Sequence, residues 1–235
     1  MARDKNTRKM QFAAQNRSLV SLKNPKSPIA EQFRTIRTNI EFSSVDHEMK
    51  KIMVTSSGPA EGKSTTTNNL AVVFAQQGKR VLLVDADLRK PTAHYSFRLE
   101  NHTGLSNVLT RQSTFDRAVR ETEQENLFVL TSGPVPPNPS ELLGSKRMAE
   151  LLEEITEIFD IVIFDTPPVL AVTDAQILAN KCDGVVLVTS SGRTENEAAL
   201  KAKELIESAK GKLIGAILNN KKAKDSQYYY YYGSS

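Results

Sequence analysis

Apolar positions in this chain form short runs that alternate with stretches of helical pattern. The runs are rich in Val, Ile and Leu and carry no charge, which is typical of strands buried on both faces. We expect strands at Ile52–Thr55, Val81–Val84, Leu127–Leu130, Ile161–Phe164, Val185–Val188 and Leu213–Leu218, and helices at Lys63–Gln77, Ser140–Ile158, Asp174–Asn180 and Thr194–Ala209. This alternation predicts an α/β fold, a doubly wound and mostly parallel sheet with helices on both faces.

A further helix is predicted before the first strand. Ser27 is a suitable N-cap and Pro28 a suitable first helical residue. The apolar positions that follow at helical spacing are Ile29, Phe33, Ile36 and Ile40. A polar side of the same helix carries Glu31, Arg34 and Arg37. On spacing alone, this triplet favours ordinary ion pairing on an exposed helix face.

The charge distribution divides the chain of 235 residues into three parts. Residues 1–26 have a net charge of +6, residues 27–220 of −4 and residues 221–235 of +2. We interpret residues 1–26 as a flexible basic arm, 27–220 as the folded domain and 221–235 as a flexible tail. No apolar run approaches the length of a membrane-spanning helix. The single cysteine excludes an internal disulfide framework.

The segment after the first predicted strand resembles a phosphate-binding loop. It reads Ser57, Gly58, Pro59, Ala60, Glu61, Gly62, Lys63, Ser64 and then Thr65, and it opens a predicted helix. Backbone N–H groups of such a loop surround phosphate oxygens, the lysine reaches the β- and γ-phosphates, and the hydroxyl binds Mg²⁺. The first glycine of the usual pattern is replaced by Ser57. The context nevertheless predicts ATP and Mg²⁺ as cofactors.

Acidic residues follow two other predicted strands. Asp85 and Asp87 come after the second strand, and Asp165 ends the strand at Ile161–Phe164. The carboxyl ends of parallel strands share one edge of a sheet, where ligands bind. We therefore expect all three carboxylates near one metal–phosphate site. Asn219 ends the last strand at the same edge, and we expect it to contact adenine.

The acceptor of the phosphoryl group is open at this level. The sequence lacks the His-Arg-Asp and Asp-Phe-Gly motifs of eukaryotic protein kinases. Water is the default acceptor and would make the chain an ATPase switch, whereas a scaffold would only bind nucleotide. The tail offers tyrosine hydroxyls, because five of the six tyrosines are Tyr228, Tyr229, Tyr230, Tyr231 and Tyr232. Composition alone fits a sticky tail equally well.

Several segments together resemble the bacterial tyrosine kinases of the P-loop NTPase fold, in the form found as a separate cytoplasmic chain in Firmicutes. The matching segments are Glu31–Ile40, Ser56–Ser64, Asp85–Pro91, Gly133–Leu142, Asp165–Pro168 and Tyr228–Tyr232. The resemblance implies a protein-tyrosine autokinase that phosphorylates its tyrosine cluster in trans. It also reverses the reading of Glu31, Arg34 and Arg37, which would link subunits in a ring.

The resemblance assigns roles to the predicted site residues. Lys63 would neutralise phosphate charge, and Ser64, Asp87 and Asp165 would organise Mg²⁺. Asp85 would take the proton of the tyrosine, although Asp85 and Asp87 could exchange roles.

Partners and cellular context are also implied by the resemblance. They are a transmembrane modulator whose cytosolic tail activates the kinase and recruits it to the inner face of the plasma membrane, and a cognate tyrosine phosphatase. The process would be capsule or exopolysaccharide synthesis, and no specific nucleic acid is expected. The competing interpretation is a partitioning or positioning ATPase. Those ATPases carry a signature lysine where this chain has Gly58.

Overall fold

The computed structural model describes residues 19–43 and 49–221. Their sheet has the strand order β3-β4-β2-β5-β1-β6-β7. All strand pairs are parallel except β3 with β4. The strands are β1 (Lys51–Ser56), β2 (Val81–Asp85), β3 (Arg120–Glu121), β4 (Leu127–Leu130), β5 (Ile161–Asp165), β6 (Gly184–Ser190) and β7 (Leu213–Asn219). The six predicted strands are confirmed, and β3 is an addition too short for a periodic pattern to predict.

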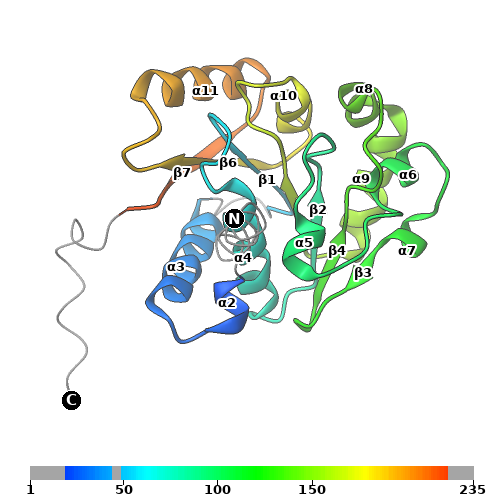
Figure 1. Ribbon diagram of the computed structural model, residues 1–235, viewed down its shortest axis with the longest axis horizontal. Helices are drawn as coiled ribbons and strands as arrows, with labels where there is room; N and C mark the ends of the chain where they lie inside the picture. The colour runs from blue at the N-terminus through cyan, green and yellow to red at the C-terminus, as the bar shows by residue number, and fades with distance from the viewer. Residues whose placement is uncertain (1–18, 44–48, 222–235) are drawn as a thin grey trace, which may run out of the picture.

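Helices cover both faces of this sheet (Figure 1). They are α2 (Val20–Lys23), α3 (Pro28–Phe42), α4 (Lys63–Ala75), α5 (Ala93–Phe97), α6 (Leu105–Leu109), α7 (Phe115–Ala118), α8 (Pro139–Gly144), α9 (Lys146–Ile158), α10 (Asp174–Ala179) and α11 (Asn196–Ser208). Two apolar cores result, one beneath α2, α3 and α4 and the other beneath α9, α10 and α11. The predicted doubly wound α/β fold is confirmed.

The predicted helix over Ser140–Ile158 is two helices. The chain turns to an extended conformation at Ser145, where φ is −68° and ψ is 159°. The Ser145 hydroxyl oxygen accepts a hydrogen bond from the backbone N–H of Met148, so this residue is the N-cap of α9. The cap begins a new helix where periodicity alone predicted a continuous one.

The prediction of an unstructured basic arm is wrong for residues 19–26. Leu19 and Ser21 are buried, and the Ser21 N–H donates to the Asn69 side chain of α4 across 2.9 Å. Helix α2 therefore packs on the folded domain. Its four residues are too few for a helical period to be recognised. Residues 1–18 and the tail from 222, which contains Tyr228–Tyr232, lie outside the described residues.

Helix α3 begins where the sequence predicts. The Ser27 hydroxyl accepts from the Ala30 N–H, and Pro28 is the first helical residue. Phe33, Ile36 and Ile40 pack toward the core, whereas Ile29 is 53% exposed. The apolar stripe therefore covers less of this helix than its spacing predicts.

Candidate active site

The loop between β1 and α4 has the backbone shape of a phosphate-binding loop. Ala60 and Gly62 adopt left-handed conformations, with φ of 61° and 94°. A Cβ atom on Gly62 would lie 1.9 Å from the Asn219 Nδ2 atom. Glycine is therefore required at this position for two reasons, the backbone conformation and the close approach of β7. The loop leads directly into the N-terminus of α4 at Lys63, a favourable place for anionic phosphate.

Glu61 fixes the shape of this loop. Its side chain accepts from the Gly58 N–H across 3.0 Å and from the Thr194 hydroxyl across 2.5 Å. The Glu61 backbone carbonyl accepts from the Asn219 side chain across 3.0 Å. The Glu61 carboxylate, predicted to take part in ATP binding, is thus committed to the loop itself. Any contact with phosphate would come from the backbone.

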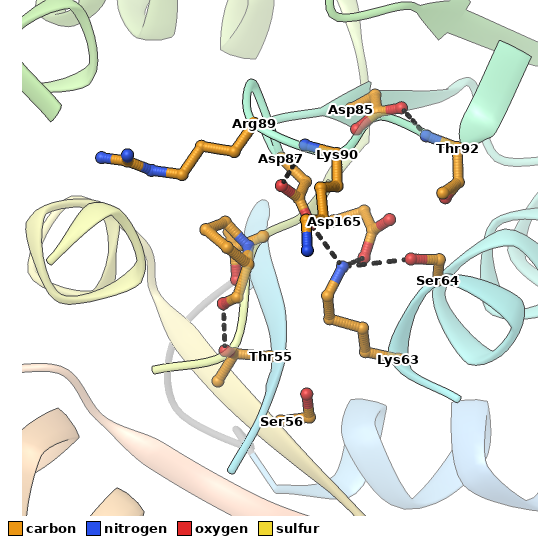
Figure 2. A network of polar contacts seen from close by, with 12 residues as sticks. Thr55, Ser56, Lys63, Ser64, Asp85, Asp87, Arg89, Lys90, Thr92 and Asp165 are labelled. Atoms are coloured by element: carbon orange, nitrogen blue, oxygen red, sulfur yellow. Dashed lines mark hydrogen bonds and ion pairs between the residues drawn. The ribbon is translucent and has the colours of Figure 1, made fainter. Parts of the chain in front are cut away.

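Lys63 is the centre of a polar cluster at the carboxyl edge of the sheet (Figure 2). Its Nζ atom lies 3.0 Å from Asp87 Oδ2, 3.3 Å from Asp165 Oδ1 and 3.1 Å from the Ser64 hydroxyl oxygen. These three oxygen-bearing side chains come from three separate segments of the chain and converge on one point. The sequence predicted this convergence from the common edge of parallel strands.

The cluster carries an excess of negative charge. Burial alone would lower the pKa of Lys63, but Asp165 and Asp87 outweigh it, so the pKa is raised and the ammonium stays protonated. Asp165 is fully buried, and its Oδ2 atom has no hydrogen-bond partner among the described residues. Asp87 and Asp165 thus face one ammonium group. This imbalance and the open acceptor atom fit a divalent cation.

The donor set matches the requirements of Mg²⁺. The described residues hold no group of three or more His, Cys, Asp or Glu side chains that could bind a metal ion. Two carboxylates and a hydroxyl are nevertheless sufficient for Mg²⁺, which usually takes its remaining ligands from water and substrate phosphates. Ser64, Asp87 and Asp165 therefore could hold this ion together with a nucleotide.

Asp85 and Asp87 differ in environment, although both were expected to face the same site. Asp85 Oδ2 accepts from the N–H groups of Thr92 and Ala93, each across 2.9 Å, and the side chain is fully buried. Burial and the neighbouring Asp165 raise the pKa of Asp85 to about 7. Asp87 lies beyond the end of β2 and lines the cleft next to Lys63.

A cleft of ≈ 540 Å³ opens over this cluster. It collects eight of the predicted site residues: Pro59, Ala60, Gly62, Lys63, Ser64, Thr65, Asp87 and Asn219. Lys90 and Pro168, from the matching segments, and Asn220, next to Asn219, also line it, together with Thr92 and Ser96, which the sequence did not single out. Ser57, Asp85 and Asp165 are buried and do not line the cleft.

An ion pair in the loop after β2 was missed by sequence reasoning. Arg89 pairs with Asp174, and both contact Ser140. Arg89 belongs to the acidic segment after β2, but its partner lies 85 positions further on. Spacing gives no signal for such a pair.

The predicted interface triplet lies on α3, away from the cleft residues. Arg34 pairs with Glu31 across 2.6 Å and donates to the Pro25 carbonyl across 2.5 Å. Arg37 instead donates to the Val73 carbonyl of α4 across 2.9 Å. Arg37 therefore has a role in packing α3 onto α4, whereas Glu31 is largely exposed.

A scan of protein families matches the model described as an AAA domain to residues 49–213. Tyrosine-protein kinase YwqD of Bacillus subtilis is 60% identical over 215 residues, which cover 92% of this chain and 91% of that protein. Tyrosine-protein kinase CpsD of Streptococcus agalactiae is 43% identical and covers 80% of this chain and 81% of its own length. The chain belongs to the bacterial tyrosine-protein kinases. It is thus an enzyme that transfers phosphate from ATP to tyrosine.

Two solved structures share the fold. The kinase domain of Escherichia coli tyrosine kinase ETK gives a TM-score of 0.85 at 35% identity, covering 91% of this chain and 84% of that one. The chimerical protein CapA2B2 gives 0.84 at 47% identity, covering 86% and 89%. No helix among the described residues of this bacterial tyrosine kinase is long and apolar enough to cross a membrane.

A more distant likeness concerns the ATPase interpretation. The septum site-determining protein MinD of Pyrococcus horikoshii, complexed with Mg-ADP, gives a TM-score of 0.62 at 23% identity, covering 72% of this chain and 69% of that one. This identity is low, so the likeness shows a common fold and no shared activity.

Proposed function

We propose that this tyrosine kinase is an autokinase whose acceptors are Tyr228–Tyr232 of a neighbouring copy. The observation that carries the proposal is the position of the last strand. Asn219 and Asn220 line the cleft, and the tyrosine cluster begins eight positions after Asn220. Only a short stretch of sequence therefore separates the tyrosines from the cleft. In an assembly of copies, we expect the tyrosines of one subunit to be within reach of a neighbour's cleft.

The proposal assigns phosphate binding, metal binding and proton transfer to different residues of the site. The P-loop backbone and Lys63 bind and orient the phosphates, and Ser64, Asp87 and Asp165 hold Mg²⁺, which supplies positive charge to the site. Asn219 contacts the adenine end. Asp85 takes the proton of the attacking tyrosine hydroxyl; Mg²⁺ bound beside it would lower its pKa from the value of about 7 that it has without metal. Asp87 remains the alternative base, because it lines the cleft.

The two aspartates can be separated by their different dependence on pH and on Mg²⁺. If Asp85 is the base, the Asp85→Asn variant loses activity and the residual rate no longer rises through pH 7. The Asp87→Asn variant raises the Mg²⁺ concentration needed for half-maximal activity. The reverse pattern would assign the base to Asp87.

The deciding experiment identifies the acceptor. Purified protein is incubated with ATP, Mg²⁺ and the cytosolic tail of its modulator, and phosphorylation is mapped by mass spectrometry. Phosphotyrosine within 228–232 that is absent in Lys63→Met supports the autokinase. ATP consumption without phosphotyrosine would favour the ATPase switch. Transfer between copies is tested by mixing two variants. One is Lys63→Met with its five tail tyrosines intact, and the other is an active kinase in which these five tyrosines are replaced by Phe.

The assembly and partners of the kinase are part of the same proposal. Glu31, Arg34 and Arg37 would join copies in a ring, and a transmembrane modulator would activate the kinase at the inner face of the plasma membrane. The chimerical protein CapA2B2, a structural relative at 47% identity, supports a kinase that works with a second polypeptide. A cognate phosphatase would reverse the modification. The regulated process would be capsule or exopolysaccharide synthesis, as the family resemblance implies.

Phosphorylation of the cluster would also change the assembly. Each phosphate adds about −1.5 to −2 charges, so several in one tail repel one another and the acidic domain. We expect the modified tail to leave the cleft or to open the ring.

A further inference from the structure

Asp174 is a fully buried carboxylate at the start of α10, and Arg89 holds both of its oxygens. Arg89 Nε lies 2.9 Å from Asp174 Oδ2, and Arg89 Nη2 lies 3.0 Å from Oδ1. The Ser140 hydroxyl donates to Asp174 Oδ1 across 2.6 Å and accepts from Arg89 across 3.2 Å. A planar guanidinium held at two atoms by a buried carboxylate has a fixed position and a fixed orientation.

This fixed pair connects the two segments that carry the site carboxylates. Arg89 lies two positions after Asp87, and in Figure 2 its side chain extends away from the Lys63 cluster while Asp87 points toward it. The Lys90 N–H donates to Asp87 Oδ1 across 3.0 Å and closes the turn between them. On the other side, residues 166–173 lead from Asp165 directly to Asp174. The pair therefore ties the segment after β2 to the segment after β5.

We propose that Arg89 and Asp174 are positioning residues of the kinase site, which set the separation between Asp87 and Asp165. The inference rests on the proposed function, in which those two carboxylates hold Mg²⁺. Asp87 follows the end of β2 and is not held by the sheet ladder, which pairs residues up to Asp85 and Asp165. Its backbone position therefore depends on the loop. The loop is held at its base by the Ala86 N–H, which donates to the Asp165 carbonyl across 2.8 Å, and by the N–H groups of Thr92 and Ala93, which donate to Asp85. Beyond this base, Arg89 and Lys90 hold the part of the loop that carries Asp87, whose carboxylate also pairs with Lys63. Lys90, which lines the cleft, is placed by the same loop.

The main variants are Asp174→Asn and Arg89→Lys. Asn keeps the size of the side chain and an acceptor for Ser140 but loses the charge. Lys keeps the charge but loses the planar fork, at a side chain that is 39% exposed and so tolerates replacement. Asp183→Asn is the matched control. Asp183 is also a paired carboxylate, accepting from the N–H groups of Lys50 and Lys51 at the opposite edge of the sheet.

Two readouts separate positioning from folding. The first is amide hydrogen exchange of residues 86–91 in the protein without nucleotide or Mg²⁺. The second is the Mg²⁺ dependence of tyrosine phosphorylation. Loss of such supporting contacts typically costs about 10- to 100-fold in metal affinity or activity. We expect faster exchange in 86–91 and a Mg²⁺ requirement raised by about tenfold in Asp174→Asn, with a smaller change in Arg89→Lys. Asp183→Asn should lower only the melting temperature.

The Asp87→Asn variant tests the metal role of Asp87 separately, so a failure of the positioning role can be distinguished from a failure of the proposed function. If Asp87→Asn raises the Mg²⁺ requirement but Asp174→Asn and Arg89→Lys change only the melting temperature, the positioning role is overturned. If Asp87→Asn leaves the Mg²⁺ requirement unchanged, the metal role of Asp87 fails, and this inference fails with it. Should Asp174→Asn not fold, Arg89→Lys decides by the same two readouts.

Discussion

The Asn219 side chain donates a hydrogen bond to the Glu61 backbone carbonyl across 3.0 Å, so the end of the last strand lies against the phosphate-binding loop. Gly62 follows Glu61, and there is no room for a side chain between it and Asn219. The strand that leads to the tyrosine tail is thus in direct contact with the loop predicted to bind ATP.

This contact predicts that Gly62→Ala weakens nucleotide binding. The added Cβ atom would meet the Asn219 amide nitrogen at 1.9 Å, so the Asn219 side chain must leave its bond to the Glu61 carbonyl or the loop must move. Gly78→Ala is a matched control, because Gly78 has nearly the same conformation, with φ of 91°, and nothing within 4 Å of the added atom. Both variants should lose about 1–2 kcal/mol from backbone strain. Titration with a fluorescent ATP analogue should show weaker binding in Gly62→Ala alone, and equal affinity in both variants would refute the steric argument.

The raised pKa of Asp85 predicts a pH-dependent stability. In the folded protein Asp85 keeps its proton up to about pH 7, whereas an unfolded chain releases it near the ordinary value of about 4. Between these values the folded state binds more protons, so the contribution of Asp85 to stability falls as pH rises. In melting curves without nucleotide and Mg²⁺, the melting temperature of Asp85→Asn should fall less from pH 5 to pH 8 than that of the parent protein. Parallel curves for the two proteins would contradict the raised pKa.

The assembly prediction is best tested with Arg34. Its Glu31 pair is worth only about 0.2–0.5 kcal/mol, and its bond to the Pro25 carbonyl is exposed to solvent, so Arg34→Ala should leave the fold intact. Arg37→Ala also removes the bond to the Val73 carbonyl, and a hydrogen bond to a charged group contributes about 1.5–3 kcal/mol. Light scattering after size exclusion should show a large assembly reduced toward monomers in Arg34→Ala and in the double variant. A constant mass in Arg34→Ala would rule out the interface.

The docking of α2 predicts that the folded domain begins before residue 26. Leu19 is 4% exposed, so Leu19→Ala should lower the free energy of unfolding by about 2–4 kcal/mol. Leu200→Ala, at a side chain 61% exposed, should change it by less than about 0.5 kcal/mol. Urea denaturation of both variants measures the difference. If both substitutions change the free energy of unfolding by the same small amount, residues 19–26 do not belong to the folded domain.

The positions of the six main strands could be predicted from the amino-acid sequence because they follow from the local hydrophobic pattern. The convergence of Lys63, Asp87 and Asp165 could be predicted because parallel strands share one carboxyl edge. The sequence did not predict Arg89 with Asp174, since a pair joined by the fold across 85 positions leaves no periodic trace. Helix α2 was missed because a four-residue helix depends on its tertiary contact with α4. The different environments of Asp85 and Asp87 were missed because β2 ends at Asp85, so strand alternation does not extend to Asp87.

The strand order has a consequence for synthesis of the chain. β1 lies between β5 and β6, so its neighbours are made more than a hundred residues after it. Contacts of such long sequence separation form late and slow folding. The cleft is complete only when Asn219 has been added, shortly before the tyrosines. The complete cleft is therefore available to a nucleotide only after β7 has been made, and the growing polypeptide must keep β1 from other partners until β5 and β6 follow.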